Sequence, residues 1–62
     1  MKRKCDVKSG DVIHIYRMIG EPHYTGREGT VKYIDDMKQI HGSWGGLALT
    51  FEDDWIIMED LT

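Results

Sequence analysis

The chain has 62 residues, of which 40% are hydrophobic and 31% charged, and its formal net charge is −3. A chain this short makes one domain and buries only about 60% of the surface that its unfolded form exposes, so homo-oligomerisation is left open. The single cysteine excludes an intramolecular disulfide and a cysteine-rich zinc module. No apolar run approaches the ~20 residues of a membrane span and no signal-peptide pattern is present, so we expect no membrane partner and a cytoplasmic location.

Charge is divided unevenly along the chain. Residues 1–8 carry four basic side chains and one acidic side chain, whereas residues 9–62 carry four basic and ten acidic ones, a net of −6. We therefore expect a basic flexible N-terminal tail at 1–8 and one folded domain at 9–62. Because affinity for nucleic acid comes largely from Lys and Arg contacts with phosphates, the acidic domain disfavours general nucleic-acid binding.

The first half of the folded part predicts two strands joined by a long loop. Residues 11–18 alternate between two faces that both carry apolar side chains, a pattern that is typical of a strand in a small barrel. Residues 19–27 contain two glycines and the only proline. They are expected to form a loop, which is longer than the ~4–6-residue median and is therefore a place to look for function. Residues 29–34 form the second predicted strand, and a turn at 35–38 follows it.

Residues 39–51 predict a β-hairpin. Gly45 and Gly46 form its two-residue turn in this interpretation, which places Ile40 opposite Phe51. One face then collects apolar residues and the other collects polar ones, as the alternation of side chains along a strand requires. The expected core face holds Ile40, Gly42, Trp44, Leu47, Leu49 and Phe51, and the opposite face holds Gln39, His41, Ser43, Ala48 and Thr50.

A short helical turn at 52–54 and a fifth strand at 55–61 complete the prediction, with Trp55 either in the core or partly exposed. The fold class is therefore all-β: a small five-stranded SH3-like barrel with a long first loop and a short helical turn before the last strand. The alternative is an incomplete five-stranded OB-type barrel, but no helix of adequate length separates the third and fourth predicted strands.

Several glycine-centred segments together resemble a known family. They are GEPHYTG at 20–26, GxxGTV at 26–31, IDD at 34–36 and QIHGSWGG at 39–46. Over residues 10–60 this combination resembles the domain-of-unknown-function 4314 family, short proteins of Gram-positive bacteria and their phages or mobile elements. The resemblance implies an SH3-like barrel and a bacterial or phage context. It implies no catalytic residues, because the family has no established activity.

The polar face of the predicted hairpin is one candidate binding surface. His41 and Ser43 project from it, and Gly42 and Gly45 leave the backbone accessible to a planar or phosphorylated ligand. An ordinary solvated sheet face is an equally good interpretation, and an interface between subunits is a third, because small residues permit close packing.

The long loop supplies the remaining candidates. Glu21, His23 and Tyr24 lie where SH3-like barrels flank their ligand groove, so Glu21 is a candidate hydrogen-bond acceptor for a ligand. Tyr24 either stacks on that ligand or simply covers the end of the barrel.

No catalytic or metal chemistry is indicated. The three histidines lack the short spacings of a zinc site, and the acidic runs lack the pattern of a calcium loop. No pair of carboxylates is placed for general acid–base catalysis. We therefore expect no metal, no cofactor and no catalytic residue. We interpret the chain as a non-catalytic module that binds or sequesters a host protein or a small nucleotide-like ligand stoichiometrically, as an inhibitor of the anti-defence type would. A nucleic-acid-associated accessory domain that uses the basic tail is the alternative.

Overall fold

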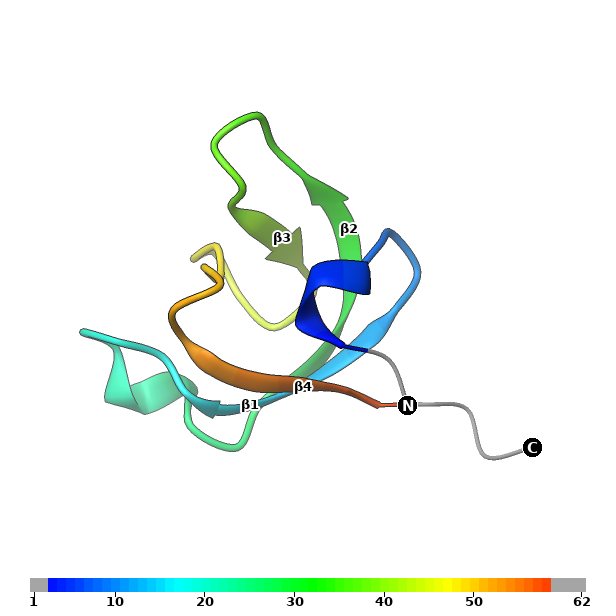
Figure 1. Ribbon diagram of the computed structural model, residues 1–62. Coiled ribbons are helices and arrows are strands. Elements are labelled where there is room, and N and C mark those ends of the chain that lie inside the picture. The colour runs from blue at the N-terminus through cyan, green and yellow to red at the C-terminus, as the bar shows by residue number, and fades with distance from the viewer. Residues whose placement is uncertain (1–2, 59–62) are drawn as a thin grey trace.

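The computed structural model describes residues 3–58, which form one four-stranded antiparallel open sheet (Figure 1). Strands β1 (Val12–Arg17), β2 (Glu28–Ile34), β3 (Ile40–Gly42) and β4 (Asp54–Met58) lie in the order β3-β2-β1-β4. Two short 3-10 helices, η1 (Lys4–Asp6) and η2 (Pro22–Tyr24), precede β1 and β2. No α-helix occurs among the described residues, so the prediction of an all-β protein is confirmed.

The core is built from alternate positions of the strands. Ile13 and Ile15 on β1 are fully buried, and β4 turns Trp55 and Ile57 to the same side, because successive side chains of a strand point to opposite faces. Trp55 therefore belongs to the core. The complete buried set is Val7, Ile13, Ile15, Met18, Val31, Ile40, Trp44, Leu49, Trp55 and Ile57.

The predicted hairpin has a different register from the one expected. Ile40 exchanges two backbone hydrogen bonds of 2.8 Å with Leu49 instead of pairing with Phe51. The expected strand at 47–51 is thus reduced to a single bridge at Leu49. Because the pairing shifts by two residues, Ile40 and Leu49 still face the core, but Leu47 and Phe51 are exposed.

The side chain of Trp44 is the physical reason for this register. Its indole folds back over Gly42, where a Cβ would lie 2.3 Å from the ring, and its Nε1 donates a 2.9 Å hydrogen bond to the carbonyl of Leu47. The chain therefore wraps around the indole and makes no tight turn at Gly45 and Gly46. Trp44 itself is buried, as the sequence predicts.

Two residues of the expected tail, Lys4 and Val7, contact the domain, whereas Arg3, Cys5, Asp6 and Lys8 are exposed. Val7 belongs to the core, and the ammonium of Lys4 donates to the carbonyl of Asp53 while lying 4.8 Å from the ring centroid of Trp55. An apolar side chain and the long stem of a lysine both gain from covering apolar surface, which accounts for this docking. The folded unit therefore includes residues that were assigned to the tail; Met1 and Lys2 lie outside the described residues.

Of the last predicted elements, the strand is confirmed in part, whereas the turn before it is not helical. Residues 51–53 make a turn, and β4 covers the first part of the strand that was expected at 55–61, whose end lies outside the described residues. None of the helices within residues 3–58 has the length and apolar character that crossing a membrane requires.

Candidate functional site

The connection between β1 and β2 is the long loop that the sequence predicts, and it folds against the segment that leads into β4. Pro22 opens η2, where its missing N–H costs nothing, and the backbone of Glu21 donates to the carbonyl of Met18 at 3.0 Å. Across the gap, the N–H of Ile19 donates to the carboxylate of Asp53 at 2.8 Å. Two segments that lie far apart in the sequence are thereby held side by side.

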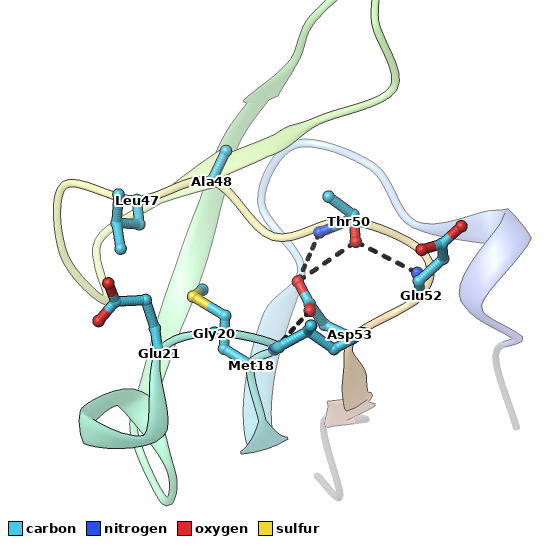
Figure 2. Close-up of a pocket in the computed structure, with 9 residues that line it drawn as sticks. Met18, Gly20, Glu21, Leu47, Ala48, Thr50, Glu52 and Asp53 are labelled. Carbon is cyan, nitrogen blue, oxygen red and sulfur yellow. Dashed lines mark hydrogen bonds between the residues drawn. The ribbon is translucent and has the colours of Figure 1, made fainter.

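A pocket with a volume of about 500 Å³ opens between these two segments (Figure 2). Met18, which is buried, and Ala48 contribute apolar surface in the middle of the pocket, and Leu47 adds apolar surface beside Glu21 (Figure 2). The carboxylates of Glu21 and Glu52 lie at its opposite ends (Figure 2). The lining residues are Met18, Ile19, Gly20, Glu21, Leu47, Ala48, Thr50, Glu52 and Asp53.

Asp53 fixes one wall of this pocket. It is 3% exposed, and its carboxylate accepts hydrogen bonds from the backbone N–H of Ile19 at 2.8 Å, from that of Thr50 at 2.9 Å and from the Thr50 hydroxyl at 3.3 Å. With both oxygens occupied, Asp53 positions the wall and is not offered to a ligand. Asp53 therefore belongs to a hydrogen-bonded turn; a threonine three residues before an aspartate is the local signal for such a turn.

Tyr24 closes the loop against the residues that follow β3. Its phenol oxygen lies so near Gly45 that a Cβ there would be 2.5 Å away. The guanidinium of Arg27 covers the Tyr24 ring at 4.2 Å from its centroid and donates a 2.9 Å hydrogen bond to the carbonyl of Trp44. Of the two roles predicted for Tyr24, this arrangement matches the covering one. His23 lies exposed on η2.

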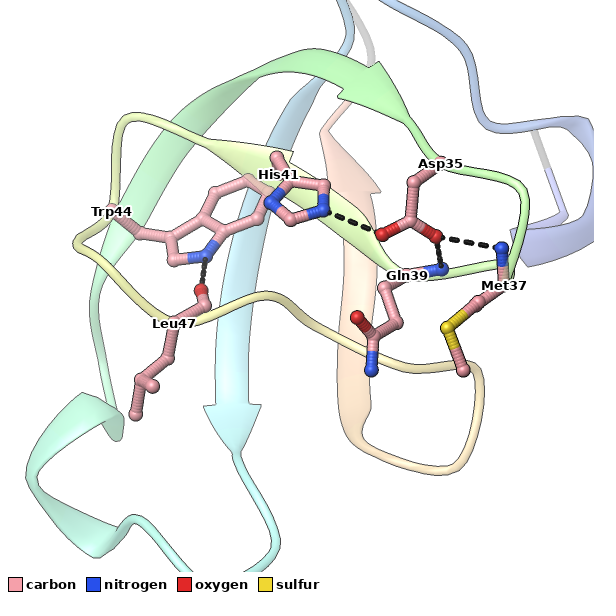
Figure 3. A network of polar contacts seen from close by, with 6 residues as sticks. All are labelled: Asp35, Met37, Gln39, His41, Trp44 and Leu47. Carbon is pink, nitrogen blue, oxygen red and sulfur yellow. Dashed lines mark hydrogen bonds and ion pairs between the residues drawn. The ribbon is translucent and has the colours of Figure 1, made fainter.

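His41 belongs to a separate polar network in the β2–β3 turn (Figure 3). Its Nε2 lies 2.8 Å from Oδ2 of Asp35, and the other carboxylate oxygen accepts the backbone N–H groups of Met37 and Gln39 at 2.9 Å each. These contacts lower the pKa of the Asp35 carboxyl below its usual value, and the hydrogen bond with His41 has the largest effect. The network braces the turn, in which Lys38 adopts a φ of 64°.

A β-bulge brings Tyr33 to the same network. The pairing of β2 with β3 shifts between Val31 and Tyr33, so Lys32 and Tyr33 both point outward while Ile34 packs against the core. The Tyr33 ring then stacks on His41 with centroids 4.4 Å apart and planes 10° from parallel. Strict alternation along the strand would place Tyr33 inside, which is why the sequence did not identify it.

Gly42 and Ser43 continue the pairing of β3 with β2. The hydroxyl oxygen of Ser43 accepts the N–H of Thr30 at 2.9 Å, and the Ser43 N–H donates to the Thr30 carbonyl at 3.1 Å. The space that a side chain at position 42 would need is occupied by the indole of Trp44, and the Thr30 carbonyl oxygen also lies close to it. The predicted glycine-rich surface is therefore used largely by the protein's own backbone and side chains.

The structure distributes the predicted site residues over three places. Glu21 lines the pocket, Tyr24 meets Gly45 in the loop closure, and His41 braces the β2–β3 turn. The pocket residues that sequence reasoning missed come from two segments: residues 18–20, next to Glu21, and residues 47–53, whose position depends on the register of the hairpin. No group of three or more His, Cys, Asp or Glu side chains within residues 3–58 is placed to hold a metal ion.

Comparison with known proteins adds no relative: no family model, no curated protein and no solved structure matches the chain.

Proposed function

We propose that this chain is a non-catalytic binding module that captures a protein partner in the pocket between residues 18–21 and 47–53. The observation that carries the proposal is the composition of that pocket, which combines an apolar middle with a carboxylate at each end. Such a surface fits an exposed segment in which a leucine-, isoleucine- or methionine-type side chain stands beside a lysine or an arginine. The net charge of −6 over residues 9–62 would draw a basic partner toward it.

The same composition argues against a nucleotide-like ligand. The nine lining residues include Glu21 and Glu52 but no lysine or arginine. A phosphate placed there would meet negative charge at both ends and no compensating cation, and the backbone N–H of Ile19 is already bonded to Asp53. Of the two ligand classes that the sequence left open, the pocket favours the protein partner.

The contacts of the N-terminal segment argue against a nucleic-acid accessory domain. Lys4 is directed toward the carbonyls of Phe51 and Asp53 and the ring of Trp55, and Arg3 lies 4.0 Å from the carboxylate of Asp6. Lys4 therefore contributes less to phosphate binding than a free cation would, because releasing it has its own energetic cost, whereas Arg3 remains 83% exposed.

Strand order supports a finer assignment of the fold. With the bridge at Leu49 counted as a shortened strand, the order becomes Leu49-β3-β2-β1-β4, the order of an SH3-like barrel whose fourth strand has shrunk to one residue. We infer an SH3-like domain on this ground. The resemblance to the domain-of-unknown-function 4314 family adds a bacterial or phage context, in which stoichiometric capture of a host protein is the action of an anti-defence type inhibitor.

Selection from a random peptide display library against the immobilised chain tests the function. We expect enriched peptides to carry Lys or Arg next to a large aliphatic residue, and Glu21→Lys to weaken the best of them about tenfold because it reverses the charge at one end of the pocket. Asp36→Lys makes the same change of charge in the exposed β2–β3 turn and serves as the matched control. Enrichment of acidic peptides, equal effects of the two variants, or nucleotide-induced shifts of the Gly20 and Leu47 amide signals would contradict the proposal.

A further inference from the structure

Leu49 lies in a short extended stretch whose two edges have different neighbours. One edge faces β3, where Leu49 exchanges two backbone hydrogen bonds of 2.8 Å with Ile40. Along an extended strand, successive residues direct their N–H and C=O groups to opposite edges. Those of Ala48 and Thr50 are therefore directed away from β3. Both residues line the pocket, so the second edge of the stretch belongs to the pocket wall.

The backbone of Ala48 is the open part of this second edge. The N–H of Thr50 donates to the carboxylate of Asp53 at 2.9 Å, and the carbonyl of Thr50 accepts a 2.8 Å hydrogen bond from Nε1 of Trp55. The N–H and C=O of Ala48, in contrast, make no hydrogen bond with any residue in the described range 3–58. Ala48 is also partly exposed, so a partner in the pocket can reach both groups.

Building on the proposed function, on which this step rests, we propose that the pocket captures its partner as an extended segment. The backbone of that segment adds to the edge at Ala48, and an aliphatic side chain enters the apolar middle of the pocket. A helix bonds its N–H and C=O groups within itself, so a helical partner would cover Ala48 and leave its donor and acceptor unsatisfied. An extended segment supplies an acceptor and a donor to the same edge.

The alternation of a strand also places the basic side chains of the partner. In Figure 2, Ala48 lies across the pocket from Met18, between the ends that carry Glu21 and Glu52. Residues two positions apart in a strand project on the same face, about 7 Å from each other. A leucine-type residue directed at Met18 therefore carries the residues two positions before and after it toward the two ends. Lysine or arginine at both of these positions answers both carboxylates.

The carboxylates at the two ends are available to such a partner. Neither Glu21 nor Glu52 forms an ion pair within residues 3–58. The basic groups nearest to the pocket in the chain are used elsewhere, because Lys4 donates to the carbonyl of Asp53 and Arg17 lies next to β4 in the strand pairing. A second copy of the chain is a poor occupant, since pairing two copies at this edge brings their acidic pockets together.

Amide hydrogen exchange tests the open edge in the protein alone. The N–H of Ala48 should exchange at nearly the rate of an unstructured peptide, whereas the N–H of Leu49, which is bonded to Ile40, should be protected. Protection of Ala48 without any added peptide would overturn the proposal. Protection that appears only at high protein concentration would overturn it too, because it would identify a second copy as the occupant.

A capped synthetic peptide of sequence Lys-Thr-Leu-Thr-Lys tests the conformation of the partner. At roughly ten times its Kd, it should slow the exchange of the Ala48 amide about tenfold. Two variants of the peptide carry N-methyl groups on alternate amides, one on the leucine and both lysines and the other on both threonines, so each set blocks one edge of the extended peptide. One variant should bind about tenfold more weakly than the unmethylated peptide, and the other should bind nearly as well.

Equal binding of the two methylated peptides, or no binding of the unmethylated one, would overturn the extended conformation. The methyl groups are placed on the peptide because Ala48→Pro would also strain the bridge at Leu49. The function proposed for the pocket fails in a different way: Glu21→Lys would then leave the binding of the unmethylated peptide unchanged, whatever the methylated peptides do.

Discussion

Replacing Asp53 by asparagine should destabilise the domain far more than its position in a surface turn suggests. The side chain is 3% exposed and accepts hydrogen bonds from Ile19 and, twice, from Thr50. An asparagine keeps one acceptor oxygen and turns an NH₂ group toward one of the two backbone donors, which leaves that donor unsatisfied. A buried unsatisfied donor costs about 1–3 kcal/mol, and hydrogen bonds to a charged acceptor exceed neutral ones, so we expect a loss of about 2 kcal/mol.

For a chain of this length, about 2 kcal/mol corresponds to a fall in Tm of roughly 8–16 °C. Urea unfolding followed by the fluorescence of Trp44 and Trp55 measures the free energy of unfolding directly, since both indoles are buried in the folded domain. Asp54→Asn is the matched control: Asp54 is exposed, and its replacement should change the free energy of unfolding by no more than about 0.5 kcal/mol. Equal and small effects of the two variants would refute the assignment of Asp53 as the group that holds the pocket wall.

Further predictions concern the loop closure and the β2–β3 turn. Gly45→Ala should displace Tyr24, whose hydroxyl would lie 2.5 Å from the new Cβ, and should destabilise the domain by about 1–3 kcal/mol. Gly46→Ala should not destabilise it, because no atom lies within 4 Å of a Cβ at that position. Thermal unfolding of the two variants compares them. The lowered pKa of Asp35 means that its contribution to stability is fully present above the unfolded-state pKa of about 3.9 and is lost as the pH falls through the folded-state pKa. Urea unfolding at a series of acidic pH values should therefore show a weaker acid dependence for Asp35→Asn than for the unchanged protein, and parallel curves would contradict this assignment.

Local pattern predicted the elements better than it predicted their pairing. The alternation of β1, the loop after it and the burial of Trp44 all follow from spacing within a few residues, because the period of a strand and the turn preference of Gly and Pro act locally. The register of the hairpin was wrong, since Gly45-Gly46 permits a tight turn but does not compel one. What decides between the pairings is the space that the Trp44 indole finds over Gly42.

The candidate site was predictable only in part for the same reason. Glu21 was identified because a long loop is visible in the sequence, but Glu52 and Leu47 join it only after the register of residues 40–49 is set. Tyr33 was missed because a bulge reverses the face on which it lies, and bulges arise from the fit between two strands and not from the residues of one strand.

The sequence by itself therefore determined an all-β domain with an acidic body, the alternation of two faces along its first strand and the loop that carries Glu21. These follow from composition and from short-range periodicity, which survive any arrangement of the strands. Only the tertiary structure decided that Asp53 is buried and that Lys4 and Val7 belong to the folded unit. Each of these depends on contacts between residues that lie far apart in the sequence, whose energies exist only after the chain has folded.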